Sequence, residues 1–233
     1  MYSIFGSVIA AISTPRGKGG IAVIRMSGDG SIAIGEKFIF PKSGKPLSAV
    51  KSNYAALCDV KNADGTTLDE AVVTVFRAPH SFTGEDTVEI SCHGGVLLSS
   101  RVLSRAFECG AVQAAAGEFT RRAFSSGKIS LSQAEAVIGK IDAKTDSSLR
   151  LWDNAAQGRI KCETDAIYDE LGEIISSAYA TIDFPEEDLA PLSRDEMRTR
   201  TEKVAAHLEA LAATYRTGHA VCEDRKSTRL NSS

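Results

Sequence analysis

A glycine-rich segment near the start of the chain, residues 14–20, contains residue types that can hold an anion. Its glycines let backbone N–H groups approach an anion closely, and Arg16 and Lys18 add positive charge. A nucleotide-binding P-loop needs G-x-x-x-x-G-K-[ST] followed by a helix, whereas residues 21–24 have the composition of a strand. The segment is therefore an anion-binding turn or an ordinary glycine turn, and it is not a nucleotide P-loop.

A charged residue, Arg25, lies within the predicted strand at residues 21–27. Strand alternation places Arg25 on the same face as the apolar Ile21 and Val23. A guanidinium in such surroundings needs a carboxylate, from the protein or from a ligand, to offset the loss of its hydration. Arg25 is therefore a candidate for a structural ion pair or for a ligand contact.

The predicted strand at residues 87–92 has a polar face that could line a cleft. Alternation directs Val88, Ile90 and Cys92 inward and leaves Glu89 on the opposite face. A carboxylate can accept two parallel N–H bonds from a guanidine-like ring edge, such as that of a pterin or a guanine. Ligand recognition and a solvated surface position are the two alternatives for Glu89.

Metal or redox chemistry has little support in the sequence. His93 precedes two glycines, but no acidic residue or cysteine stands at ligand spacing from it, so we assign it no catalytic role and predict no metal site. The five cysteines are scattered without a C-x-x-C pair, which indicates free thiols in a reducing compartment.

A cluster of cations, Arg121, Arg122 and Lys128, falls within residues 117–128, a stretch that the sequence predicts to be rich in loops. Anionic tails or phosphates could dock on three neighbouring cations, and the alternative is a solvated hinge between two domains.

The elements that carry these residues form an α/β half. Period-two patterns predict strands at residues 7–12, 21–27, 54–59, 71–76 and 87–92, with a turn at residues 62–65. Helices are predicted at residues 30–38 and 96–108, the second ending at Cys109-Gly110.

A helical half follows. The capping box Ser130-x-x-Gln133 opens an alanine-rich helix, and one apolar period predicts a single helix from residue 146 to about residue 182. Pro185 ends it, and the box Ser193-x-x-Glu196 opens a second amphipathic helix. After Val221 the pattern fails, so we expect residues 222–233 to be a disordered or spurious polar tail.

Composition restricts the class of protein. A chain of 233 residues with 43% hydrophobic residues can bury a real core, and its net charge of −3 leaves room only for local contact with RNA. No apolar run approaches the roughly 18 residues that span a membrane, and the start lacks the pattern of a signal peptide. A cytoplasmic protein without membrane contact is expected.

Seven short motifs follow one another along the chain. They are TPRGKGG (14–20), RMSG (25–28), SFTGED (81–86), HGG (93–95), GEFTRRAF (117–124), QAEA (133–136) and IDFP (182–185). Together they resemble the bacterial tRNA modification GTPase family MnmE, also called TrmE, over residues 9–221. The resemblance implies an α+β fold: a mixed α/β, aminomethyltransferase-like domain that binds tetrahydrofolate and dimerises (1–127), then a partial central helical domain (128–221), and the tail (222–233).

The same resemblance implies the activity and the partners of the whole protein. Members hydrolyse GTP with potassium and magnesium, form a homodimer through the N-terminal domain, and act with the FAD-containing MnmG on C5 of the wobble uridine in tRNA. A 5-formyl- or 5,10-methylene-tetrahydrofolate would supply the one-carbon unit. The family's folate contacts fall on Arg25, Glu89 and Lys128, with Glu89 at the pterin edge and the two cations at the polar or glutamyl end.

The chain departs from the family where a GTPase domain should begin. The polar stretch 222–233 stands in place of a Gly-x-x-x-x-Gly-Lys-Ser loop, so we expect an N-terminal fragment with no catalytic residues and no GTP hydrolysis of its own. Two other hypotheses are a self-sufficient folate-dependent one-carbon transferase and an interaction module built from the helices.

Overall fold

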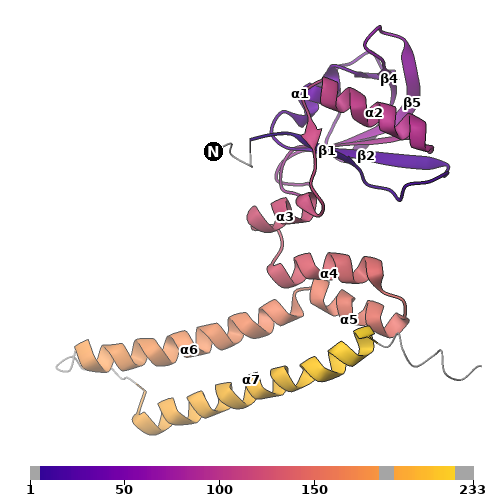
Figure 1. Cartoon of the computed structure of the whole chain (residues 1–233). Helices are drawn as coiled ribbons and strands as arrows, with labels where there is room; N and C mark the ends of the chain where they lie inside the picture. Colours follow the sequence, from indigo (N-terminus) through magenta and orange to yellow (C-terminus); the bar gives the residue numbers. More distant parts are fainter. Residues whose placement is uncertain (1–5, 184–191, 224–233) are drawn as a thin grey trace, which may run out of the picture. The chain divides into compact units, whose positions relative to one another are not determined.

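The computed structural model describes residues 6–183 and 192–223, with side chains up to residue 214. The chain divides into two units, Met1–Ile129 and Ser130–Ser233 (Figure 1). The first unit combines a sheet with helices and the second is helical, which confirms the predicted α+β class.

The first unit is built on a seven-stranded sheet with the order β3-β4-β5-β6-β2-β1-β7. Neighbouring strands are antiparallel except for the parallel pair β1 and β7. The strands are β1 (Ile9–Ile12), β2 (Ile21–Ser27), β3 (Ile39–Pro41), β4 (Tyr54–Lys61), β5 (Thr67–Phe76), β6 (Thr87–His93) and β7 (Val112–Gln113). The five predicted strands are confirmed, and the short strands β3 and β7 were not predicted.

One face of the sheet carries the hydrophobic core. The helices α1 (Ser31–Glu36) and α2 (Val96–Glu108) lie over this face with the short 3₁₀ turn η1 (Leu47–Ala49) (Figure 1). Alternate residues of the central strands point toward them and are buried, among them Ile24, Met26, Val88, Ile90 and Val73. This burial confirms the predicted inward face of β6.

The opposite face of the sheet keeps large apolar side chains in contact with solvent. Ile21 on β2, Val72 on β5 and Leu57 on β4 are all exposed, and Arg25 and Glu89 lie on this same face. Strand alternation explains the arrangement, because these residues alternate along their strands with residues that point into the core.

The second unit consists of the helices α4 (Leu131–Asp142), α5 (Asp146–Ala156), α6 (Arg159–Asp183) and α7 (Arg194–Glu223). Reciprocal bonds between Ser130 and Gln133 and between Ser193 and Glu196 confirm both predicted capping boxes. A third box, Thr145 with Ser148, opens α5.

The predicted single helix over residues 146–182 is wrong. The first helix, α5, ends at Ala156, and after the cap residue Gln157 comes Gly158 with φ +74°, a left-handed conformation that terminates helices. The apolar period continues across this break, so periodicity alone could not reveal it. Cys222 and Glu223, predicted to be part of the tail, belong to α7, whereas Pro185 and residues 224–233 lie outside the described residues.

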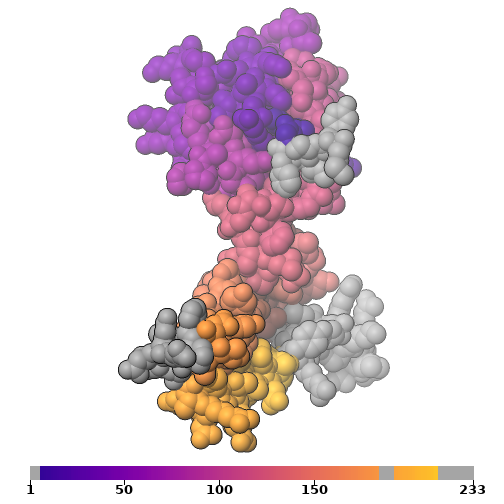
Figure 2. All heavy atoms as spheres, turned by 90° about the vertical axis from the view of Figure 1, so that its left-hand side faces the viewer, coloured from indigo at the N-terminus to yellow at the C-terminus, as the bar shows by residue number. Residues whose placement is uncertain are grey.

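The long helices α6 and α7 run side by side, and their atoms form one continuous surface in the space-filling view (Figures 1 and 2). The Arg200 guanidinium on α7 donates to both oxygens of Glu170 on α6, with a distance of 2.7 Å from Nη2 to Oε2. Ile167, Ile174 and Val204 are buried within the helical unit. The amphipathic stripes predicted for these helices therefore find at least part of their packing surface in each other.

Candidate functional site

Arg25 and Glu89 are direct cross-strand neighbours on β2 and β6. Arg25 Nε donates to Glu89 Oε1 at 2.7 Å, and Nη2 lies 2.7 Å from the same oxygen. Each side chain keeps 25% of its surface exposed, so the pair can be reached from solvent. Of the two alternatives for Arg25, the ion pair is formed, and both residues lie where a ligand on the open sheet face could contact them.

Two aromatic rings lie near the Arg25 guanidinium. The centroids of the Phe82 and Phe119 rings each lie 5.5 Å from its Cζ atom, within the range of cation–π attraction. Phe82 belongs to the connection between β5 and β6, and Phe119 to the helix α3 (Glu118–Ser125). Neither ring was predicted to have a role, because nothing in the local sequence pattern indicates that segments so far apart meet at Arg25.

Lys128 lies at the connection that carries Phe82. Its Nζ donates to the carbonyl oxygen of Pro79 at 2.6 Å, and its side chain is exposed. Within the described part of the chain, Lys128 contacts neither Arg25 nor Glu89. The structure thus brings together two of the three predicted ligand contacts and places the third beside the same loop.

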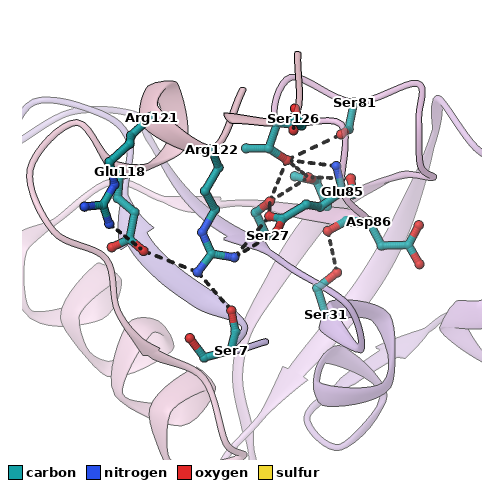
Figure 3. A network of polar contacts seen from close by, with 12 residues as sticks. Ser7, Ser27, Ser31, Ser81, Glu85, Asp86, Glu118, Arg121, Arg122 and Ser126 are labelled. Carbon is teal, nitrogen blue, oxygen red and sulfur yellow. Dashed lines mark hydrogen bonds and ion pairs between the residues drawn. The ribbon is translucent and has the colours of Figure 1, made fainter. Parts of the chain in front are cut away.

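The predicted docking site or hinge at residues 117–128 is wrong for Arg122. These residues include α3, and Arg122 is only 2% exposed, so neither a phosphate nor bulk solvent reaches it. Figure 3 shows Arg122 between Glu118 on one side and Glu85 with Ser27 on the other. Its Nη1 lies 3.0 Å from Glu85 Oε1, and its Nη2 donates to the Ser7 carbonyl at 3.0 Å and to Glu118 at 3.3 Å.

Buried hydroxyls extend this network. Ser27 Oγ donates to Glu85 Oε2 at 2.8 Å and lies 2.7 Å from Thr83 Oγ1. Ser126 Oγ, just beyond the end of α3, donates to the Thr83 carbonyl at 2.8 Å (Figure 3). Because Ser27 is two residues from Arg25 and Thr83 is next to Phe82, the network borders the Arg25 site.

The glycine-rich segment of residues 14–20 lies against the start of α2. Gly94 N donates to Gly20 O at 3.1 Å, and a Cβ on Gly94 would lie only 2.1 Å from Gly19 O, so this approach requires glycine. The segment and the first residues of α2 line a cavity of about 280 Å³, to which Arg16 and Lys18 contribute.

His93 has an acidic partner that sequence spacing did not indicate. Its Nδ1 lies 2.8 Å from Asp69 Oδ1, and its backbone N–H donates to Asp69 Oδ2 at 2.9 Å. Among the described residues, no group of three histidine, cysteine or acidic side chains could hold a metal ion. None of the helices searched there is both long and apolar enough to cross a bilayer.

Comparison with protein families assigns both units. Residues 8–128 match the model of the GTP-binding protein TrmE N-terminus, and residues 131–223 match that of the MnmE helical domain. The chain is therefore of the class of proteins in which a TrmE N-terminal α+β domain precedes an MnmE helical domain. The chain belongs to the family of the tRNA modification GTPase MnmE.

Curated relatives named tRNA modification GTPase MnmE agree with this assignment. The chain is 40% identical over 218 residues to the protein of Akkermansia muciniphila, 40% over 215 residues to that of Symbiobacterium thermophilum, and 41% over 218 residues to that of Shouchella clausii. Each alignment covers 92% of this chain and 47% of the relative. The chain thus spans about half the length of the curated relatives it matches.

Proposed function

We propose that residues 8–128 bind a tetrahydrofolate derivative and that the chain is the folate-binding and helical part of a tRNA-modifying GTPase. The observation that carries the proposal is the accessible Arg25–Glu89 pair with two aromatic rings near the Arg25 guanidinium, at positions where the family resemblance implies folate contacts. A pterin offers a flat ring and a polar edge, and these residues match both features.

The geometry favours a different division of roles from the one expected on residue type. Arg25 and Glu89 are 2.7 Å apart, so both would contact the same end of an extended ligand. Both contacts from Arg25 use Glu89 Oε1, which leaves Oε2 to accept an N–H from a pterin edge. Lys128, beside Pro79, would then serve the glutamyl end through its ammonium.

The remaining family properties complete the proposal for the whole protein. The folate, as the 5-formyl or the 5,10-methylene form, would supply the one-carbon unit for C5 of the wobble uridine in tRNA. GTP hydrolysis with potassium and magnesium, and joint action with the FAD-containing MnmG, would require parts of the protein beyond these domains.

A homodimer through the first unit is also proposed. Its support is the open sheet face, where Ile21, Leu57 and Val72 remain exposed, because large apolar patches mark interaction surfaces. Light scattering at micromolar concentration should give the mass of a dimer, and Leu57→Glu should shift that mass toward the monomer. A monomeric parent chain would contradict this part of the proposal.

Calorimetric titration of 5-formyltetrahydrofolate into the 233-residue chain tests the folate site. Glu89→Gln and Arg25→Ala should each weaken binding by roughly tenfold or more, since each loses charge-assisted hydrogen bonds. Glu70→Gln is the matched control, because Glu70 also forms a surface ion pair on this sheet, with Lys42, but lies away from Arg25. Unchanged affinity in both site variants would refute the assignment.

A further inference from the structure

The two rings at Arg25 come from segments that lie outside the sheet. Phe82 is in the connection between β5 and β6, and Phe119 is in the first turn of α3. Their common position around the guanidinium therefore depends on contacts that hold these two segments to each other and to β2.

Arg122 and Glu85 make that connection. Arg122 lies one turn after Phe119 on α3, and Glu85 lies three residues after Phe82 in the connecting segment. Their side chains form a two-pronged contact, with distances of 3.0 and 3.1 Å from Arg122 Nη1 to the two oxygens of Glu85. Glu85 in turn accepts from Ser27 on β2, the strand that carries Arg25.

We propose that Arg122 is a positioning residue for the Arg25 site. Acting through Glu85, it fixes the Phe82 and Phe119 rings near the Arg25 guanidinium. Arg122 is almost completely buried, and its guanidinium contacts Glu85, Glu118 and the Ser7 carbonyl, so its effect on a ligand would be indirect. The consequence for ligand binding rests on the proposed folate function, whereas the consequence for the rings does not.

Arginine is required at this position by the geometry of its contacts. Two nitrogens of one planar group reach Glu85, Glu118 and the Ser7 carbonyl, which come from three different segments. A lysine ammonium keeps the charge but carries all its donors on a single atom, so it cannot span these acceptors at once. Arg122→Lys thus separates the effect of geometry from the effect of charge.

The test replaces one of the two phenylalanine rings with an indole in the 233-residue chain. Trp152 is the only tryptophan, so Phe82→Trp in a Trp152→Phe background reports on the Arg25 surroundings alone. Adding Arg122→Lys should shift the emission of this indole to the red and increase its quenching by acrylamide, at temperatures far below unfolding. In the chain with native Phe82, Arg122→Lys should weaken 5-formyltetrahydrofolate binding by roughly three- to tenfold, the value of one cation–π contact.

Arg121→Lys is the matched control, because Arg121 is the adjacent residue on α3 and its side chain is 56% exposed. It should change neither readout. If Arg122→Lys does not fold, Ser126→Ala removes a single bond to the same loop and should shift the indole emission in the same direction.

The outcomes distinguish this inference from the proposed function. A chain that does not bind folate would refute the proposed function, but the indole emission measured without folate would still decide the positioning role. Folded Arg122→Lys and Ser126→Ala variants with parental emission and quenching would overturn the inference, whatever their folate affinity.

Discussion

Replacing Gly139 with alanine should destabilise the helical unit, although alanine is the better helix former. Gly139 lies in α4, and a Cβ there would stand 2.1 Å from Cδ2 and 2.2 Å from Cε2 of Trp152 on α5. Carbon atoms normally pack at about 3.5 Å or more, so the rigid indole would have to move by roughly 1.5 Å. Such overpacking costs about 1–3 kcal/mol, which exceeds the helix-propensity gain of about 1 kcal/mol.

The assay is urea unfolding followed by tryptophan fluorescence. Because Trp152 is the only tryptophan and lies at the contact, its emission reports the unfolding of this unit and any displacement of the indole in the folded state. Gly139→Ala should lower the free energy of unfolding by up to about 2 kcal/mol, the overpacking cost less the propensity gain.

Gly172 provides the matched control. It lies within α6, and no atom is within 4 Å of where its Cβ would stand, so Gly172→Ala gains helix propensity without a clash. This substitution should raise the free energy of unfolding by about 0.5–1 kcal/mol. If Gly139→Ala stabilised the unit as much as Gly172→Ala does, the close packing of α4 on α5 would be refuted.

Three further predictions concern single contacts. The hydrogen bond from Arg200 lowers the pKa of Glu170 below 4.5, so this pair stabilises the folded unit above that pH and its contribution is lost as the pH falls through the lowered pKa. The difference in the free energy of unfolding between the parent and the Arg200→Ala variant should therefore be largest at neutral pH. It should shrink as the pH falls and Glu170 becomes protonated. Ser130→Ala should cost about 1 kcal/mol in thermal unfolding followed by circular dichroism, because it removes a helix cap. Burial raises the pKa of the Cys92 thiol to about 11, so peptide mapping after Ellman's reagent at pH 8 should find Cys162 modified and Cys92 protected until unfolding.

Alternation and capping signals predicted most of the fold because they are local. The helix at residues 96–108 and the two capping boxes appear where the sequence placed them. β3 and β7 have only three and two residues, too few for a period-two pattern to be recognised. Arg122 was interpreted as a cation open to anions because Glu85, its carboxylate partner, lies 37 residues away in the sequence.

The candidate site was predictable only as separate residues. Alternation gave the correct face for Arg25 and for Glu89, but their pairing depends on the register of β2 against β6, which a single sequence does not specify. The rings of Phe82 and Phe119 could not be anticipated at all, because their position depends on the buried contacts of Arg122.

The pairing of Arg25 with Glu89 restricts the chemistry of any ligand at this site. A simple anion would have to compete with Glu89 for the guanidinium and would meet the repulsion of its carboxylate, so it gains little. A ligand that presents an acceptor and an N–H donor side by side on one ring edge can instead bond Arg25 and Glu89 together without separating them. Phenylalanine rings near Arg25 can add favourable contact for a flat, conjugated group but none for an inorganic ion. A heterocycle with a mixed donor and acceptor edge, such as the pterin of the proposed folate, therefore suits this pair better than a simple anion does.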